Sequence, residues 1–136
     1  MRLIIDTNIL VSALLKDSST RKILLLPFFE FYLPEFALEE IEKHKSKICK
    51  RSGLTETEFT LTLNILLSSV SVVPYSRIQE FIEEATELIG DIDELDIPFI
   101  ALALAIPNDG IWSEDKHLQK QKRIKIWKTE DLLKNL

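Results

Sequence analysis

The sequence predicts an α/β protein, in which a parallel sheet of about five strands lies between two layers of helices. Three observations indicate this three-layer α/β/α fold. Strand-like and helical segments alternate along the chain, the strand-like segments are continuously apolar, and 46% of residues are hydrophobic while 29% are charged. Continuously apolar strands are typical of sheets that are covered on both faces. The length of 136 residues fits one domain over residues 1–136.

The first half of the chain is expected to supply three strands and four helices. The strands are expected at residues 3–5, 31–33 and 70–73. The helices are expected at residues 7–15, 20–26, 36–50 and 55–67. Pro27, Pro34 and Pro74 end the segments that precede them. Thr55 and Glu58 have the spacing of a capping box, which marks a helix start.

The second half is expected to supply two strands and four helices. The strands are expected at residues 111–113 and 125–127. The helices are expected at residues 76–88, 97–106, 115–122 and 129–136. The segment 97–106 is apolar nearly all round, so it should be a buried helix, and Pro98 suits its first turn. Thr129 is the expected N-cap of the last helix.

Several classes of protein are excluded by composition. The three glycines have neither the GxGxxG nor the P-loop spacing, and the single Cys49 allows no intramolecular disulfide and no Cys-based zinc cluster. The longest nearly apolar stretch, residues 97–107, is too short for a membrane span. Because the N-terminus also lacks the apolar region of a signal peptide, we expect a cytoplasmic protein without membrane association.

The net charge of −5 argues against nucleic-acid binding, but the charges are segregated along the chain. Basic residues concentrate at residues 43–51 and 116–128, and acidic residues between Glu80 and Asp96. Each basic run has two interpretations that we weigh equally. It can be a solvated surface, or it can hold nucleic-acid phosphates.

Carboxylates follow two of the expected strands. Asp6 follows the first strand and Asp115 the fourth, at the sheet edge where ligands bind in parallel α/β proteins. Asp93 and Asp96 precede the buried helix and are three residues apart, so they can share a face. Glu40 lies at the border of the apolar face of its helix.

A divalent cation would relieve the repulsion among such carboxylates, which otherwise raise each other's pKa values. Oxygen ligands, with neither a cysteine nor a paired histidine, favour Mg²⁺ or Mn²⁺ over Zn²⁺. Each acid also has a simpler interpretation. Asp6 and Asp115 can be helix caps, Asp96 an acid of a first turn, and Glu40 an exposed surface residue.

Four motifs in order make the sequence resemble the PIN-domain family of metal-dependent ribonucleases over nearly the whole chain. They are Leu-Ile-Ile-Asp-Thr-Asn at 3–8, Leu-Glu-Glu-Ile at 38–41, Asp-x-x-Asp-x-Pro-Phe-Ile-Ala-Leu-Ala at 93–103, and Ser-x-Asp at 113–115. The resemblance implies that Asp6, Glu40, Asp96 and Asp115 are catalytic and hold Mg²⁺ or Mn²⁺. The choice of Glu40 over Glu39 or Glu42 rests on the family's register. It also implies that Asp93 is an additional metal ligand and that Asn8 and Ser113 are supporting groups.

The resemblance further implies an endoribonuclease that uses metal-activated water and leaves a 5′-phosphate and a 3′-hydroxyl. It implies RNA as substrate, a homodimer, and either the toxin of a toxin–antitoxin pair with an antitoxin partner or an RNA-processing enzyme. The basic side chains expected to contact RNA are Lys43, Lys45, Lys47, Lys50, Arg51 and Lys116.

Two other classes of function compete with this one. The first is a metal-free module of the same fold that binds RNA or protein without catalysis. The second is a receiver-like signalling domain with an acidic Mg²⁺ pocket. A receiver resembles a pattern in which a phosphorylated Asp ends the third strand, whereas the third expected strand here ends in Val72-Val73-Pro74. We therefore disfavour the receiver.

Overall fold

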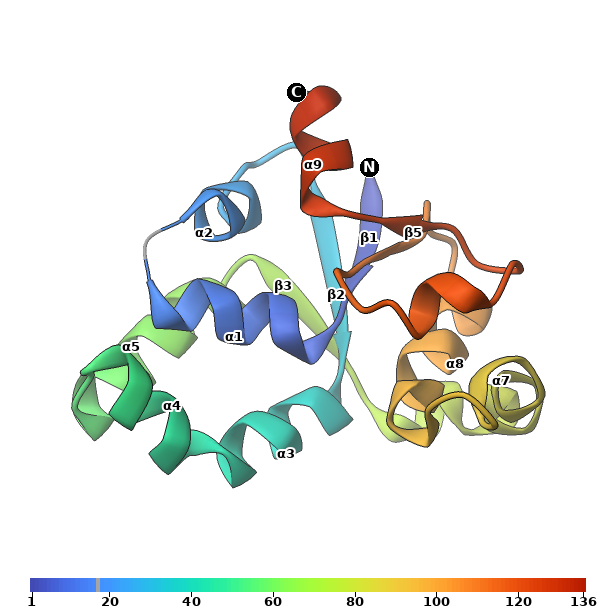
Figure 1. The fold of residues 1–136 in the computed structure, drawn as a ribbon, viewed down its shortest axis with the longest axis horizontal. Coiled ribbons are helices and arrows are strands. Elements are labelled where there is room, and N and C mark those ends of the chain that lie inside the picture. Colours follow the sequence, from blue (N-terminus) through green and yellow to red (C-terminus); the bar gives the residue numbers. More distant parts are fainter. Residues whose placement is uncertain (17) are drawn as a thin grey trace.

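A five-stranded, entirely parallel sheet forms the centre of the computed structural model, which describes residues 1–16 and 18–136 (Figure 1). The strand order is β3-β2-β1-β4-β5. The strands are β1 (Arg2–Ile5), β2 (Glu30–Pro34), β3 (Val70–Val73), β4 (Ile111–Trp112) and β5 (Ile126–Trp127). The predicted parallel α/β architecture is confirmed, and all five strands occur where the apolar segments predict them.

Helices lie on both sides of the sheet. Figure 1 shows α1 to α5 on one side of β1 and β2, and α7 and α8 on the other. The helices are α1 (Thr7–Leu15), α2 (Ser19–Leu24), α3 (Glu35–Lys43), α4 (Lys45–Ser52), α5 (Glu56–Leu67), α6 (Tyr75–Ile78), α7 (Ile82–Ile89), α8 (Ile97–Ala105) and α9 (Thr129–Lys134). Among the described residues, no helix combines the length and the apolar character that crossing a membrane requires.

The pairing of β1 with β4 positions the candidate site. Strand β1 is central, and its Leu3, Ile4 and Ile5 are fully buried. Ile5 is in register with Trp112, so both strands end at the same level of the sheet. Helix α8 packs against β1 and β2 through residues that are buried over the whole run 99–103. Both faces of the central strand are thus covered, as its apolar sequence predicts.

Two predicted helices are interrupted. The helix expected at 36–50 is divided at His44, whose backbone (φ −103°, ψ 11°) leaves the helical region. The break turns the chain so that α4 packs against α1 and Ile48 is buried. The helix expected at 76–88 is interrupted by a 3-10 turn at Gln79–Phe81 that joins α6 to α7.

The helix expected at 115–122 is reduced to a 3-10 turn at Leu118–Lys120. Side chains in this segment bond to the backbone instead. Asp115 Oδ1 accepts from the His117 amide at 2.8 Å, and Gln121 bonds to both the amide and the carbonyl of Ile124. Such local bonds compete with a helical backbone.

The expected capping by Thr129 is also wrong, because Thr129 is the first residue of α9 and Lys128 is its N-cap. The Thr129 hydroxyl accepts a hydrogen bond from the Trp112 indole at 3.0 Å, so it is used to join α9 to β4. Asp131 accepts from the Lys128 amide at 2.9 Å and so caps the helix. The capping box of Thr55 and Glu58 at the start of α5 is confirmed.

Candidate active site

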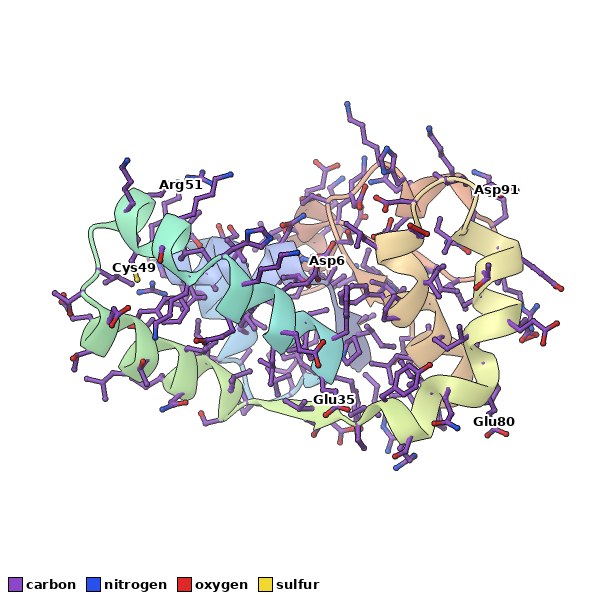
Figure 2. The ribbon with its side chains drawn as sticks, turned by 90° about the horizontal axis from the view of Figure 1, so that it is seen from below. Asp6, Glu35, Cys49, Arg51, Glu80 and Asp91 are labelled. Atoms are coloured by element: carbon purple, nitrogen blue, oxygen red, sulfur yellow. The ribbon has the colours of Figure 1, made fainter. Side chains whose placement is uncertain are left out.

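The ends of β1 and β4 bring Asp6 and Ser113 together. Asp6 follows the last residue of β1 and is the N-cap of α1, where its Oδ1 accepts from the Ile9 amide at 2.9 Å. Its Oδ2 accepts a short hydrogen bond from the Ser113 hydroxyl. Figure 2 shows Asp6 near the middle of the molecule, between the α3–α4 segment and α8. Asp6 therefore has a capping role and also lies at the sheet edge where a ligand is expected.

Asp96 is a buried carboxylate, and one of its two oxygens lacks a hydrogen-bond partner within the described part of the chain. It ends a 3-10 turn at Glu94–Asp96 and directly precedes α8. Since α8 and α1 lie on different sides of the sheet, Asp96 and Asp6 come from different helical layers. Its side chain is only 7% exposed, and its Oδ2 has no hydrogen-bond partner among the described residues. Burial, reinforced by the charges of Asp115, Asp93 and Asp6, raises the pKa of Asp96 to about 8.

Asp96 belongs to a group of four side chains from two loops. Asp93, Asp96, Asp115 and His117 each offer one ligand atom, and these atoms all lie within 4.8 Å of one another. His117 Nδ1 lies 3.0 Å from Asp93 Oδ2 and 3.9 Å from Asp115 Oδ1. The hydrogen bond with His117 is the main cause that lowers the pKa of Asp93. We name these four residues the acidic cluster.

His117 is the member of the acidic cluster that sequence reasoning missed. The sequence carries a histidine two residues after Asp115, but a regular helix at 115–122 would have turned the two side chains in different directions. Because that segment is mostly irregular, the His117 amide can donate to the Asp115 carboxylate. The side chains of Asp115 and His117 then both lie close to Asp93 and Asp96. The two-residue spacing of Asp115 and His117 was the sequence feature that could have indicated a shared site.

Asp6 is coupled to the acidic cluster electrostatically without being one of its four members. Burial raises the pKa of Asp6 to about 6, while hydrogen bonds from Ser113 and the Ile9 amide oppose this shift. The charge of Asp115 raises it further. Asp6 is 5% exposed, so removing it from water is the dominant cost of its negative charge.

Glu40 lies on α3 and is hydrogen-bonded to Thr7, the residue that follows Asp6. Its Oε1 accepts from the Thr7 hydroxyl at 2.5 Å, and its side chain is partly buried. Glu39 and Glu42, the neighbours that the sequence left as alternatives, are both exposed. Glu40 is thus the acid of α3 that bonds to Thr7, the residue after Asp6, but it is outside the acidic cluster.

A pocket of about 520 Å³ opens beside the acidic cluster. Asp93, Asp115 and His117 line one part of it, and Asn8 lines another. Its remaining lining residues are Ile9, Ser12, Thr20, Glu114 and Thr129. Of the two predicted supporting groups, Asn8 is therefore an exposed lining residue, whereas Ser113 is fully buried and binds Asp6. Ser113 also accepts from the Asp115 amide at 2.9 Å, which fixes the start of the loop after β4.

The donor set fits a divalent cation. Three carboxylates and one imidazole converge, and a buried carboxylate oxygen of Asp96 lacks any donor from the described residues. A buried acceptor of this kind is costly unless a proton or a cation satisfies it. Asp93, Asp96 and Asp115 are the residues whose carboxylates would hold such an ion.

The predicted RNA-contacting side chains lie on α3, α4 and the loop after β4. Lys43, Lys47, Lys50, Arg51 and Lys116 are exposed, and Lys45 is partly buried with its Nζ 5.6 Å from the centre of the Phe59 ring. Figure 2 shows Arg51 and Asp91 on opposite sides of Asp6. The two basic runs differ in their surroundings. Arg51 at the end of α4 lies away from the acidic segment that contains Asp91, whereas Lys116 lies between Asp115 and His117 of the acidic cluster and Arg123 lies 3.8 Å from Glu84.

Comparisons with known proteins identify the fold and the family of this chain. Among solved structures, the fold resembles a chain of the crystal structure described as VapBC2 from Rickettsia felis bound to a DNA fragment from their promoter, with a TM-score of 0.73 and 20% identity. The match covers 94% of this chain and 98% of that chain. No curated protein sequence matches this chain. The family model described as PIN domain matches residues 4–136, and the chain therefore belongs to the PIN-domain family.

Proposed function

We propose that this protein is an endoribonuclease that depends on Mg²⁺ or Mn²⁺. The single observation that carries the proposal is the buried Oδ2 of Asp96, which has no hydrogen-bond partner in residues 1–16 and 18–136 and lies within a group of converging carboxylates at the carboxyl edge of the sheet. A bound divalent ion would lower the pKa of water and stabilise negative charge on a phosphate. Membership of the PIN-domain family supports nuclease activity in general.

The residues of the chain have distinct roles in the proposed hydrolysis. Asp93, Asp96 and Asp115 would hold the ion, and Asp6, whose charge acts on Asp96, would add negative charge beside it. Glu40, which accepts from the Thr7 hydroxyl, would add a further carboxylate at the same edge of the sheet. The Ser113 hydroxyl donates to the Asp6 carboxylate and so orients it. The same oxygen accepts from the Asp115 amide and so fixes the loop that carries Asp115. The pocket lined by Asn8 and His117 admits the RNA backbone. The attacking water gives up a proton as its oxygen bonds to phosphorus, the bond from phosphorus to the 3′-oxygen breaks, and the 3′-oxygen takes up a proton.

The exposed lysines on α4 and Lys116 are proposed to neutralise RNA phosphates on either side of the scissile bond. Their local positive charge would attract phosphates even though the chain as a whole carries a net charge of −5. The fold likeness to a chain of a VapBC2 structure supports a role as the toxin of a toxin–antitoxin pair, with an antitoxin protein as partner. The family resemblance also suggests a homodimer.

The test is cleavage of labelled single-stranded RNA by wild type, Asp96→Asn and Glu94→Gln, with Mn²⁺, with Mg²⁺ and with a chelator. Glu94 is an exposed acid two residues from Asp96 and outside the acidic cluster, so Glu94→Gln is the matched control. We expect wild type and Glu94→Gln to cleave only with metal, and Asp96→Asn to lose at least 100-fold in rate, as removal of a catalytic charge commonly does.

Equal cleavage by all three proteins would trace the activity to a contaminant and overturn the proposal. Absence of cleavage by any of them, on a broad panel of RNAs, would favour the alternative of a non-catalytic module. A mapped product with a 5′-phosphate would support hydrolysis by water, because internal attack by the ribose 2′-hydroxyl leaves a 5′-hydroxyl instead.

A further inference from the structure

We propose that His117 is a ligand of the divalent ion, so that the site is a mixed nitrogen and oxygen site with a preference for Mn²⁺ over Mg²⁺. This inference rests on the proposed function, because it concerns the same ion. It adds a residue that neither the acidic motifs nor the family match assigns. His117 lies in the loop after β4, two residues beyond Asp115.

The distances around His117 fit a shared octahedral ion. Bonds of about 2.1 Å place neighbouring ligand atoms roughly 3.0 Å apart and opposite ones roughly 4.2 Å apart. His117 Nδ1 lies 3.0 Å from Asp93 Oδ2 and 3.9 Å from Asp115 Oδ1, and both distances fall within the range that separates two ligand atoms of one ion. The maximum separation of 4.8 Å within the acidic cluster requires only a small contraction.

The backbone fixes His117 in this position. Its amide donates to Asp115 Oδ1 at 2.8 Å, and the Asp115 amide donates to Ser113 Oγ at 2.9 Å. Ser113 is buried and bonded to Asp6. This series of hydrogen bonds links the loop to the end of β1. The backbone of His117 is therefore fixed, and it holds the imidazole close to Asp93.

A second observation points to a cation rather than to a simple histidine–carboxylate pair. Asp93 and His117 satisfy each other, but the buried Asp96 oxygen in the same group remains without a donor among the described residues. An ion among the four residues satisfies all of them at once. Its binding would replace the hydrogen bond between Nδ1 and Asp93, with the proton of the neutral imidazole on Nε2.

A nitrogen ligand changes which ion the site prefers. Mg²⁺ favours oxygen ligands and water, whereas imidazole suits transition metals, and affinities rise from Mn²⁺ along the first row. We therefore expect removal of the imidazole to weaken Mn²⁺ binding by about tenfold or more and Mg²⁺ binding much less, by analogy with the loss seen when metal-site partners are removed.

The experiment is pulsed electron paramagnetic resonance of Mn²⁺ bound to tag-free protein, which detects directly coordinated ¹⁴N. His44 is the other histidine of the chain and is exposed at the junction of α3 and α4, so His44→Gln is the matched control. We expect nitrogen modulation in wild type and in His44→Gln, and its loss in His117→Gln. Calorimetry on the same samples gives the Mn²⁺ and Mg²⁺ affinities.

If His117→Gln does not fold, His44→Gln labelled with ¹⁵N-histidine replaces it, because His117 is then the sole source of a labelled imidazole. The ¹⁴N pattern should change to that of ¹⁵N. Mn²⁺ bound at a single site without histidine modulation would overturn this inference and leave the metal site intact. Failure of wild type to bind Mn²⁺ at all would overturn both the inference and the proposed metal dependence.

Discussion

The Ser113 hydroxyl donates a hydrogen bond to the Asp6 carboxylate and so joins the end of β4 to the end of β1. The two residues are 107 positions apart in the sequence and are both buried. This bond opposes the effect of burial on the pKa of Asp6. Ser113 is therefore the residue through which the central strand and the loop of the acidic cluster are connected.

Ser113→Ala should destabilise the protein by about 1–3 kcal/mol, because it leaves a buried carboxylate without its strongest donor. Urea denaturation at neutral pH measures the change in free energy of unfolding. Ser71, an exposed serine on β3, provides the control Ser71→Ala, which we expect to change the free energy by less than about 0.5 kcal/mol. Equal effects of the two substitutions would contradict the role given to Ser113.

The metal-free protein should become less stable as the pH rises from about 4 to 8. The pKa values of Asp96 and Asp6 are raised from 3.8 to about 8 and about 6 in the folded state. In this range the unfolded chain has lost protons that the folded chain still binds, so a rising pH favours unfolding. The stability associated with these groups is complete below pH 4 and is lost as the pH passes their folded pKa values.

Comparison of wild type with Asp96→Asn isolates this effect, because the amide cannot titrate. Between pH 5 and 8, in a chelator, wild type should lose on the order of a few kcal/mol relative to the variant. Chemical denaturation at each pH measures this difference. Parallel pH profiles for the two proteins would mean that Asp96 ionises normally in the folded protein.

Divalent metal should stabilise the folded protein at neutral pH. An ion that binds only the folded state contributes about 2.7 kcal/mol at 100 times its dissociation constant, and it also relieves the repulsion within the acidic cluster. Thermal denaturation with and without Mn²⁺ should show an increase in Tm for wild type and for Glu94→Gln. Asp96→Asn should show little increase, and an equal increase would place the ion elsewhere.

The basic surface of α4 should contribute to RNA affinity through charge. Lys47→Ala with Lys50→Ala should weaken binding of a non-cleavable RNA and lower the slope of log affinity against log salt by up to about 0.7 for each phosphate that is no longer neutralised. Both side chains are exposed, so folding should be unaffected. Lys134→Ala, on α9 at the top of Figure 1 and away from α4 at the lower left, is the control. An unchanged slope would identify α4 as a solvated surface.

Gly110 should not tolerate alanine. It precedes β4 with φ +132°, and an added Cβ would lie 2.4 Å from the Lys125 carbonyl oxygen of the neighbouring chain segment. Gly110→Ala should therefore destabilise the protein by more than about 2 kcal/mol. Gly53, with φ +76° and open space around it, should lose only about 1 kcal/mol on the same change, since backbone strain alone remains. Thermal denaturation distinguishes the two.

The sequence by itself determined the order of the elements, the parallel sheet and the membership of a family. Short apolar runs such as Leu3-Ile4-Ile5 favour strands that are covered by helices on both faces. Asp6 directly follows this strand, so it lies at the edge of the sheet. These features are local and depend on the period and the hydrophobicity of short segments. Helix boundaries at 36–50 and 115–122 were less predictable, because packing of α4 on α1 and side-chain bonds to the backbone override local preference.

Only the tertiary structure decided which charged groups meet. The strand order places β4 beside β1, so Ser113 reaches Asp6, while the loop after β4 brings Asp115 and His117 to Asp93 and Asp96. No local pattern encodes these contacts, because they depend on the strand order and on a loop that departs from a helix. The burial of Asp96 and the missing donor at its Oδ2 are likewise properties of the packed chain, as far as the structure describes it.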